Sequence, residues 1–152
     1  MAAVAATMEE IGSHGARTMA FGLEPDLCIA VDVTHATDAP GVDAGELGEH
    51  GLGSGPVITR GAIVSRPLND LLDAAAESVG IECTSEAAGS ATHTDADAIH
   101  VSRTGVPTAV VSIPLRYMHS PVEMVQLDDV ENAAKLIAAF AQKLTSEIDF
   151  RR

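Results

Sequence analysis

The chain alternates short, continuously apolar segments with longer segments in which apolar residues recur every three or four positions. The short apolar segments predict buried strands at 4–7, 27–31, 56–58, 81–84 and 107–113. The longer segments predict helices at 15–21, 67–80, 95–103 and 128–148. Strands that alternate with helices are typical of a layered α/β domain. The stretch 35–55 has no period and is rich in Gly, Asp and Glu, so it predicts a long loop.

Two of the predicted helices have clear sequence signals. Pro67 suits the first turn of a helix, and Gly80 suits the left-handed residue that ends one. Leu68, Leu71, Leu72, Ala75 and Val79 lie between them at helical spacing. The last helix begins with two acidic residues, and its packing face is predicted to consist of Val130, Ala134, Ile137, Ala138 and Leu144.

The length and the cysteines limit the class of protein. A chain of 152 residues suits one domain or part of one. No apolar run approaches the roughly 20 residues that cross a bilayer, and no secretory leader is visible, so a cytoplasmic location is expected. Cys28 and Cys83 have no CxxC or CxxxH partner and are predicted to be small core residues rather than disulfide or zinc ligands.

The charge balance excludes two kinds of partner. The chain has 22 acidic and 9 basic residues, a formal net charge of -13, and Lys135 and Lys143 as its lysines. Such a negative field disfavours nucleic acid and anionic membranes. Scarce lysine favours a halophilic protein, in which salt screens the self-repulsion, and an ordinary acidic cytosolic protein is the alternative.

The candidate chemistry lies at the predicted strand ends. Glu9 and Glu10 follow the first strand, and two adjacent carboxylates in a crevice need a cation, a shared proton or open water between them. Asp32 and His119 follow two other strands, and ligands gather at the carboxyl edge of open α/β sheets. Carboxylates and imidazole are ligands of hydrolytic Zn²⁺ or Co²⁺, although most adjacent glutamates are simply solvated.

These residues also stand within a family pattern. The segments are VAATMEEIG (4–12), GART (15–18), IAVDVTHATD (29–38), TDA (94–96) and PLRYMHSP (114–121). Together they resemble the M42 family of metallo-aminopeptidases, which includes tetrahedral, dodecameric and deblocking aminopeptidases and some members labelled endoglucanases. The resemblance implies a three-layer α/β/α sandwich of the zinc-exopeptidase (phosphorylase/hydrolase-like) type. It also implies peptide substrates, two divalent ions (Zn or Co) and a homo-oligomer, a dodecamer in complete relatives.

The resemblance assigns a role to each candidate residue. Glu9 matches the general base that activates the metal-bound water. Glu10 and His119 match ligands of one ion, and Asp32 matches a ligand of the other. The family's upstream histidine, bridging aspartate and inserted β dimerisation domain have no counterpart here. Residues 1–152 are therefore expected to be the carboxyl-terminal part of one catalytic domain, inactive when isolated. A non-catalytic remnant or association module is the alternative, and glycoside hydrolysis is a weaker one.

Six further residues have a functional and a structural interpretation. His35 and Asp38 orient metal ligands or form a turn. Thr94 and Asp95 line a substrate pocket or cap the following helix. The other two, Arg116 and Tyr117, hold the loop of His119 or face the substrate carbonyl. The remaining histidines, His14, His50 and His100, have no ligand-like spacing and are predicted to lie on the surface or on helix faces.

Overall fold

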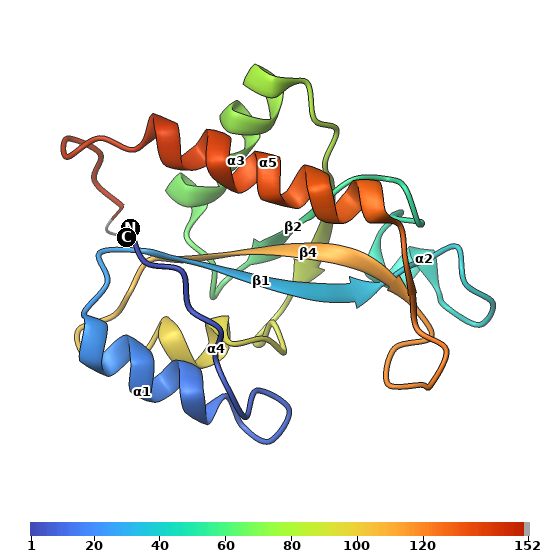
Figure 1. The fold of residues 1–152 in the computed structure, drawn as a ribbon, viewed down its shortest axis with the longest axis horizontal. Helices are drawn as coiled ribbons and strands as arrows, with labels where there is room; N and C mark the ends of the chain where they lie inside the picture. The colour runs from blue at the N-terminus through green and yellow to red at the C-terminus, as the bar shows by residue number, and fades with distance from the viewer. Residues whose placement is uncertain (151–152) are drawn as a thin grey trace.

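The computed structural model describes residues 1–150 and shows a sheet between two layers of helices (Figure 1). The elements in chain order are α1 (His14–Leu23), β1 (Cys28–His35), α2 (Ala44–Leu47), β2 (Val57–Gly61), α3 (Arg66–Val79), β3 (Thr84–Ala88), α4 (Ala96–Ile99), β4 (Thr108–Arg116), β5 (Met124–Val125) and α5 (Leu127–Lys143). Helices α3 and α5 cover one face, and α1 and α4 cover the other. The predicted α/β/α sandwich is confirmed.

The sheet is mixed, with the strand order β1-β4-β2-β3, and β5 pairs with β4 beyond this path. β1 is parallel to β4, β2 is parallel to β3, and β2 is antiparallel to β4. Asp32 lies opposite Ser112 in the register of β1 and β4. Because β1 and β4 are parallel, their carboxyl ends reach the same edge of the sheet, and the loop of His119 follows β4 at that edge.

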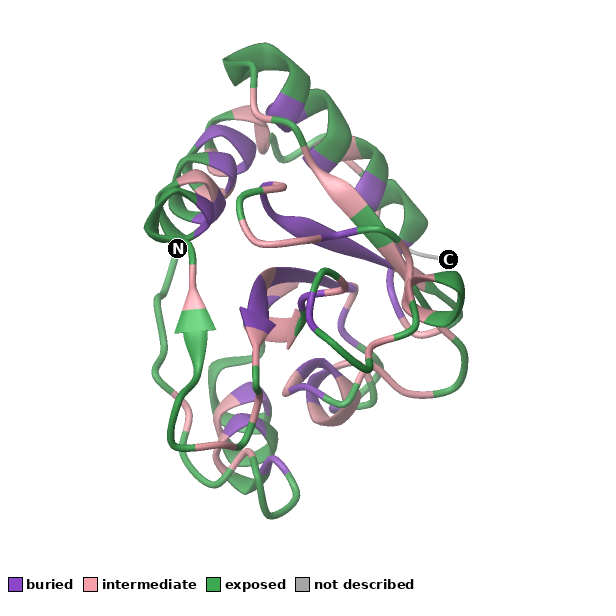
Figure 2. Cartoon of the chain, turned by 90° about the vertical axis from the view of Figure 1, so that its right-hand side faces the viewer, coloured by how far each residue is buried: buried purple, intermediate pink, exposed green. Residues whose placement is uncertain are grey.

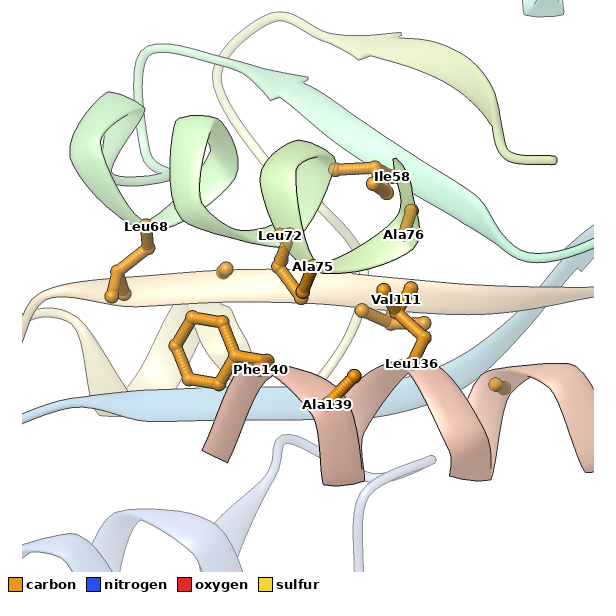
Figure 3. Close-up of a cluster of buried hydrophobic side chains, with 11 residues drawn as sticks. Ile58, Leu68, Leu72, Ala75, Ala76, Val111, Leu136, Ala139 and Phe140 are labelled. Atoms are coloured by element: carbon orange, nitrogen blue, oxygen red, sulfur yellow. The ribbon is translucent and has the colours of Figure 1, made fainter. Parts of the chain in front are cut away.

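The main core lies between the sheet and the α3–α5 layer (Figure 3). Ile58 and Val111 from the strands meet Leu72, Leu136 and Phe140 from the two helices, and all five side chains are buried. Residues on the opposite face of β1 and β4 pack under α4, where Ala30 and Val110 contact Val64 and Ala96. Because successive strand residues face opposite sides, one strand pair serves both cores.

Helix α5 buries a different face from the one predicted. Val130 and Ala134 are exposed, whereas Ala133, Leu136 and Phe140 are buried. The apolar residues form an arc that is wider than one packing face, so helical spacing alone does not select the part that is buried. The large side chains Leu136 and Phe140 decide it because they bury the most apolar area. Figure 2 shows the buried positions of the helices turned toward the sheet.

The predicted strand at 4–7 is wrong, because residues 1–6 have no regular structure and are mostly exposed. No described strand lies beside them, and a strand is stable only with a hydrogen-bonded neighbour. The strand predicted at 81–84 instead forms at Thr84–Ala88, because the Ile81 N–H still bonds Ala76 of α3. Helix α3 matches its prediction and ends at Gly80 with φ 66°.

Two other predicted boundaries also differ. The helix predicted at 95–103 is reduced to α4, because tight turns follow and Arg103 takes a left-handed φ of 53°. The predicted loop at 35–55 contains the short helix α2, whose Asp43 side chain accepts from the Gly45 N–H at 2.8 Å. Among the described residues, no helix is long and apolar enough to cross a membrane.

Candidate functional site

Glu9 and Glu10 lie in a tight turn before α1 rather than at the end of a strand. The Glu9 carbonyl accepts from the N–H groups of Gly12 and Ser13, both at 3.0 Å. Gly15 then packs against Thr7 so closely that a Cβ would lie 2.4 Å from the Thr7 carbonyl oxygen. The turn therefore fixes the acidic pair without the strand that the sequence predicted, and a larger residue at position 15 would move it.

The structure brings Glu10 and His119 together across 109 positions of sequence. Glu10 Oε1 and His119 Nε2 are 3.2 Å apart, and both side chains are largely exposed. Two ligands that bind one tetrahedral ion at about 2.0–2.1 Å lie about 3.3 Å from each other. The loop of His119 is held by its own N–H, which donates to Glu123 Oε1 at 2.6 Å. The spacing of this pair therefore suits a shared ion.

Asp32 lies within β1 rather than directly after a strand, because β1 stays paired with β4 as far as His35. Its Oδ1 accepts from the Val33 N–H at 2.7 Å. Burial raises the pKa of Asp32, and the charges of Asp95, Glu10 and Glu86 add to the rise, against the hydrogen bond from Val33. Asp32 is therefore a half-buried carboxylate among like charges.

The general-base candidate, Glu9, shares this environment. Burial raises the pKa of Glu9 above its ordinary value, and the charges of Asp32, Glu10, Asp95 and Asp97 raise it further. These carboxylates therefore interact electrostatically although they come from three segments of the chain. A cation would relieve their repulsion.

The sequence left two roles open for Thr94 and Asp95, which are capping α4 and lining a substrate pocket, and the two residues differ in the capping role. Thr94 is buried, and its Oγ1 accepts from the Ala96 N–H at 3.1 Å, so Thr94 makes the capping bond of α4. The Asp95 side chain makes no capping bond. Burial raises the pKa of Asp95, and a hydrogen bond from Ser13 opposes the rise. Asp95 therefore adds negative charge beside Glu9 and Asp32.

Asp38 and Arg116 join two loops at the edge of the site. Arg116 Nε donates to Asp38 Oδ1 at 2.9 Å, and its Nη2 donates to Oδ2 at 2.6 Å. Asp38 Oδ2 also accepts from the Leu52 N–H at 3.2 Å. The hydrogen bonds from Arg116 hold the pKa of Asp38 below its ordinary range. This pair ties the loop after β1 to the end of β4, directly before His119.

The two other candidates beside this pair are exposed. His35 ends β1 with an exposed side chain. Tyr117 is 43 % exposed and has a left-handed φ of 60°. The roles of His35 and Tyr117 in the site stay predictions.

The sequence placed His50 wrongly and did not single out Glu86. His50 is only 1 % exposed, so its predicted surface position is wrong, and burial lowers its pKa. Glu86 accepts from Thr34 Oγ1 at 2.6 Å and from Thr59 Oγ1 at 2.7 Å. Both depend on contacts between distant segments, and no local pattern marks them.

Within residues 1–150, no three His, Cys, Asp or Glu side chains are grouped so that they could hold one ion. The pair Glu10–His119 nevertheless has the spacing and the donor chemistry of two zinc or cobalt ligands. The neighbouring carboxylates raise one another's pKa, which a divalent cation would reverse. The residues present therefore fit part of a metal centre.

Comparisons with known proteins identify the class. Residues 1–136 match the family model described as M42 glutamyl aminopeptidase. The chain is 40 % identical over 141 residues to the lysyl aminopeptidase of Pyrococcus furiosus, covering 93 % of this chain and 40 % of that protein. The matched proteins are named as aminopeptidases. The chain belongs to the peptidase M42 family.

Solved structures agree with this fold. The TET aminopeptidase from the marine sediment archaeon Thaumarchaeota archaeon SCGC AB-539-E09 superposes with a TM-score of 0.86 at 33 % identity, covering 94 % of this chain and 40 % of that one. The Pyrococcus horikoshii TET1 peptidase, which can assemble into a tetrahedron or a large octahedral shell, gives 0.68 at 35 % identity, over 90 % and 39 %. The chain thus spans about two fifths of the length of these relatives.

Proposed function

We propose that this chain is part of a metal-dependent aminopeptidase, which releases amino-terminal residues from peptides through a metal-activated water. The observation that supports the proposal best is the 3.2 Å separation of Glu10 Oε1 and His119 Nε2. Family membership supports the class of reaction, since the matched relatives are named as aminopeptidases. The substrates are therefore peptides with a free amino terminus.

Each site residue has a distinct role in this proposal. Glu10 and His119 hold one ion, and Asp32 contributes to the second. Divalent Zn or Co bound there would lower the pKa of a bound water and polarise the peptide carbonyl. Glu9 takes the proton of that water as general base. Its raised pKa suits this task, because a base works best when its pKa approaches the working pH.

The chain alone is proposed to bind metal weakly and to lack two-metal catalysis. Catalytic zinc sites use three protein ligands, whereas Glu10 and His119 supply two and Asp32 supplies one. The family resemblance assigns the other ligands to a histidine and a bridging aspartate outside residues 1–152. An assembly of several copies, such as the shell formed by TET1, is proposed for the complete protein.

Activity tests the proposal when residues 1–152 are joined to the preceding half of an M42 relative. We expect Co²⁺-dependent cleavage of aminoacyl-anilide substrates, and Glu9→Gln should reduce kcat by about 10²–10⁴-fold. Glu24→Gln is the matched control. Glu24 is an exposed glutamate that pairs with Arg103, away from the Glu10–His119 pair. Undiminished activity in Glu9→Gln would contradict the role of Glu9 as the base.

The metal ligands can be tested on residues 1–152 alone. Calorimetric titration with Co²⁺ should show weak binding that Glu10→Gln and His119→Ala each remove or weaken about 10-fold or more. Binding in both variants as strong as in the unaltered chain would contradict this ligand pair.

Glycoside hydrolysis is the second candidate function, and one observation favours it. A structure of an endoglucanase from Thermotoga maritima superposes with a TM-score of 0.60 at 29 % identity, covering 82 % of this chain and 36 % of that one. Release of reducing sugar that a chelator does not inhibit would favour this function. A non-catalytic association module remains the alternative if neither substrate is cleaved and no Co²⁺ binds.

A further inference from the structure

A carboxylate bridge joins two strands that are not neighbours in the sheet. Glu86 of β3 accepts from Thr34 Oγ1 of β1 at 2.6 Å and from Thr59 Oγ1 of β2 at 2.7 Å. The strand order β1-β4-β2-β3 puts two strands between β1 and β3. The Glu86 side chain therefore connects the two outer strands of this order. Hydrogen bonds to a charged acceptor are about twice as strong as those between neutral groups.

The bridge lies where the backbone ladder of the sheet is weak. β2 and β4 pair through only two residue pairs, Val57 with Ser112 and Ile58 with Val111. β1 is also an edge strand of the described sheet, paired only with β4. Its carboxyl-terminal part is paired with β4 on one side as far as His35, and the bridge from Thr34 adds a side-chain restraint to this edge strand.

Thr34 lies two residues after Asp32 on the same strand. Residues i and i+2 of a strand face the same side of the sheet, so both side chains point to the same face. A restraint on Thr34 consequently limits both the position of the Asp32 backbone and the direction of its side chain. A ligand that must reach its ion within a few tenths of an ångström depends on such support.

We propose that Glu86 is a positioning residue, which through Thr34 fixes the segment of β1 that presents Asp32 to a divalent cation. The inference rests on the proposed function, because it takes Asp32 as a metal ligand. Both Glu86 oxygens already accept from threonine hydroxyls, which suits a structural tie better than direct metal binding. Glu86 thus acts on the metal through β1.

The test compares three variants of residues 1–152. Thr34→Val removes the hydroxyl and keeps the shape, Thr34→Ser keeps the hydroxyl, and Val79→Ala is a control at an exposed position at the end of α3. Co²⁺ is titrated, and NMR follows the backbone amides of Val33 and Ser120, which report separately on Asp32 and on the Glu10–His119 pair. We expect Thr34→Val to weaken Co²⁺ binding at Val33 about 10–100-fold, with little change at Ser120, and Thr34→Ser to restore it.

Hydrogen exchange without metal separates this inference from the proposed function. The β1 amides after Asp32 should exchange faster in Thr34→Val than in Thr34→Ser or in the unaltered chain. Faster exchange without Co²⁺ binding in any form of the chain would support the bridge and contradict the proposed metal site. Equal Co²⁺ affinity at Val33 in Thr34→Val and the unaltered chain, or unchanged exchange, would overturn the positioning role of Glu86.

Discussion

Asp129 offers the sharpest test of how the fold is held together. It lies in the first turn of α5 and is 1 % exposed. Its Oδ2 accepts from the Gly53 N–H at 2.8 Å, and its Oδ1 accepts from the Gly55 N–H at 2.9 Å. One carboxylate therefore ties the loop before β2 to the start of α5. Both glycines have positive φ, so the loop has no regular ladder of its own.

The expected loss in the free energy of unfolding when Asp129 is substituted follows from these two hydrogen bonds. A hydrogen bond to a charged group contributes about 1.5–3 kcal/mol, and a buried group left without a partner costs about 1–3 kcal/mol. Because the Gly55 bond is buried and the Gly53 bond is partly buried, we expect Asp129→Ala to lower the free energy of unfolding by about 4 kcal/mol. Asp129→Asn keeps one acceptor oxygen and should cost about 2 kcal/mol.

Urea unfolding followed by circular dichroism measures this loss. With a slope of about 2 kcal/mol per molar urea, Asp129→Ala should move the midpoint by about 2 M. Asp128→Ala is the matched control, because Asp128 is an exposed acid in the same turn, where its interaction with the helix dipole contributes about 0.5 kcal/mol and its hydrogen bond from Gln126 Nε2 is long, at 3.4 Å, and exposed. Losses for Asp129→Ala and Asp128→Ala within 1 kcal/mol of each other would refute the reasoning.

Three further predictions concern the core and the titrating groups. Phe140→Ala should cost about 3–5 kcal/mol, whereas exposed Val130→Ala should cost less than about 1 kcal/mol, and a reversed order in urea unfolding would contradict the buried face of α5. Because burial lowers the pKa of His50 below 6.5, the folded state binds fewer protons there than the unfolded state. Stability should therefore fall as the pH drops from 6.5 through the folded pKa, and His50→Gln should flatten this part of the profile. Because the pKa of Asp95 is raised above 3.8, the folded state binds a proton at Asp95 more tightly than the unfolded state does. The stabilisation from this bound proton is lost as the pH rises through the raised pKa. Asp95→Asn should then raise the thermal midpoint at pH 7 by a few degrees, on the order of 1 kcal/mol, and an unchanged or lower midpoint would contradict the cost of burying this carboxylate in its ionised form.

Local signals account for the parts of the fold that the sequence predicts well. Helix α3 has Pro67 at its start, Gly80 at its end and apolar residues at constant spacing, and the structure keeps all three features. The face of α5 was not predictable in the same way, because its apolar residues form an arc that is wider than one packing face. The face is chosen by the space that Leu136 and Phe140 fill between the sheet and α3.

The candidate site depends on contacts that no local pattern contains. Glu10 and His119 meet because the turn before α1 lies against the loop that follows β4. The sequence suggested this meeting through strand ends and through the family resemblance, although the strand before Glu10 is absent from the structure. The bond between Thr34 and Glu86 spans 52 positions and crosses two strands, so its prediction requires the strand order itself.

The carboxylates of the site link metal binding to stability. Burial raises the pKa of Glu9, Asp32 and Asp95, and like charges add to the rise for Glu9 and Asp32, so at neutral pH the burial and repulsion of these ionised carboxylates destabilise the folded chain. A divalent ion that binds only the folded state replaces this repulsion with attraction, and it stabilises the fold in proportion to the logarithm of its concentration over Kd. Because the isolated chain supplies few ligands, this stabilisation should be small in residues 1–152 and larger once further ligands complete the site. The same arrangement of like charges that weakens the chain by itself is therefore what makes it suitable for a metal centre.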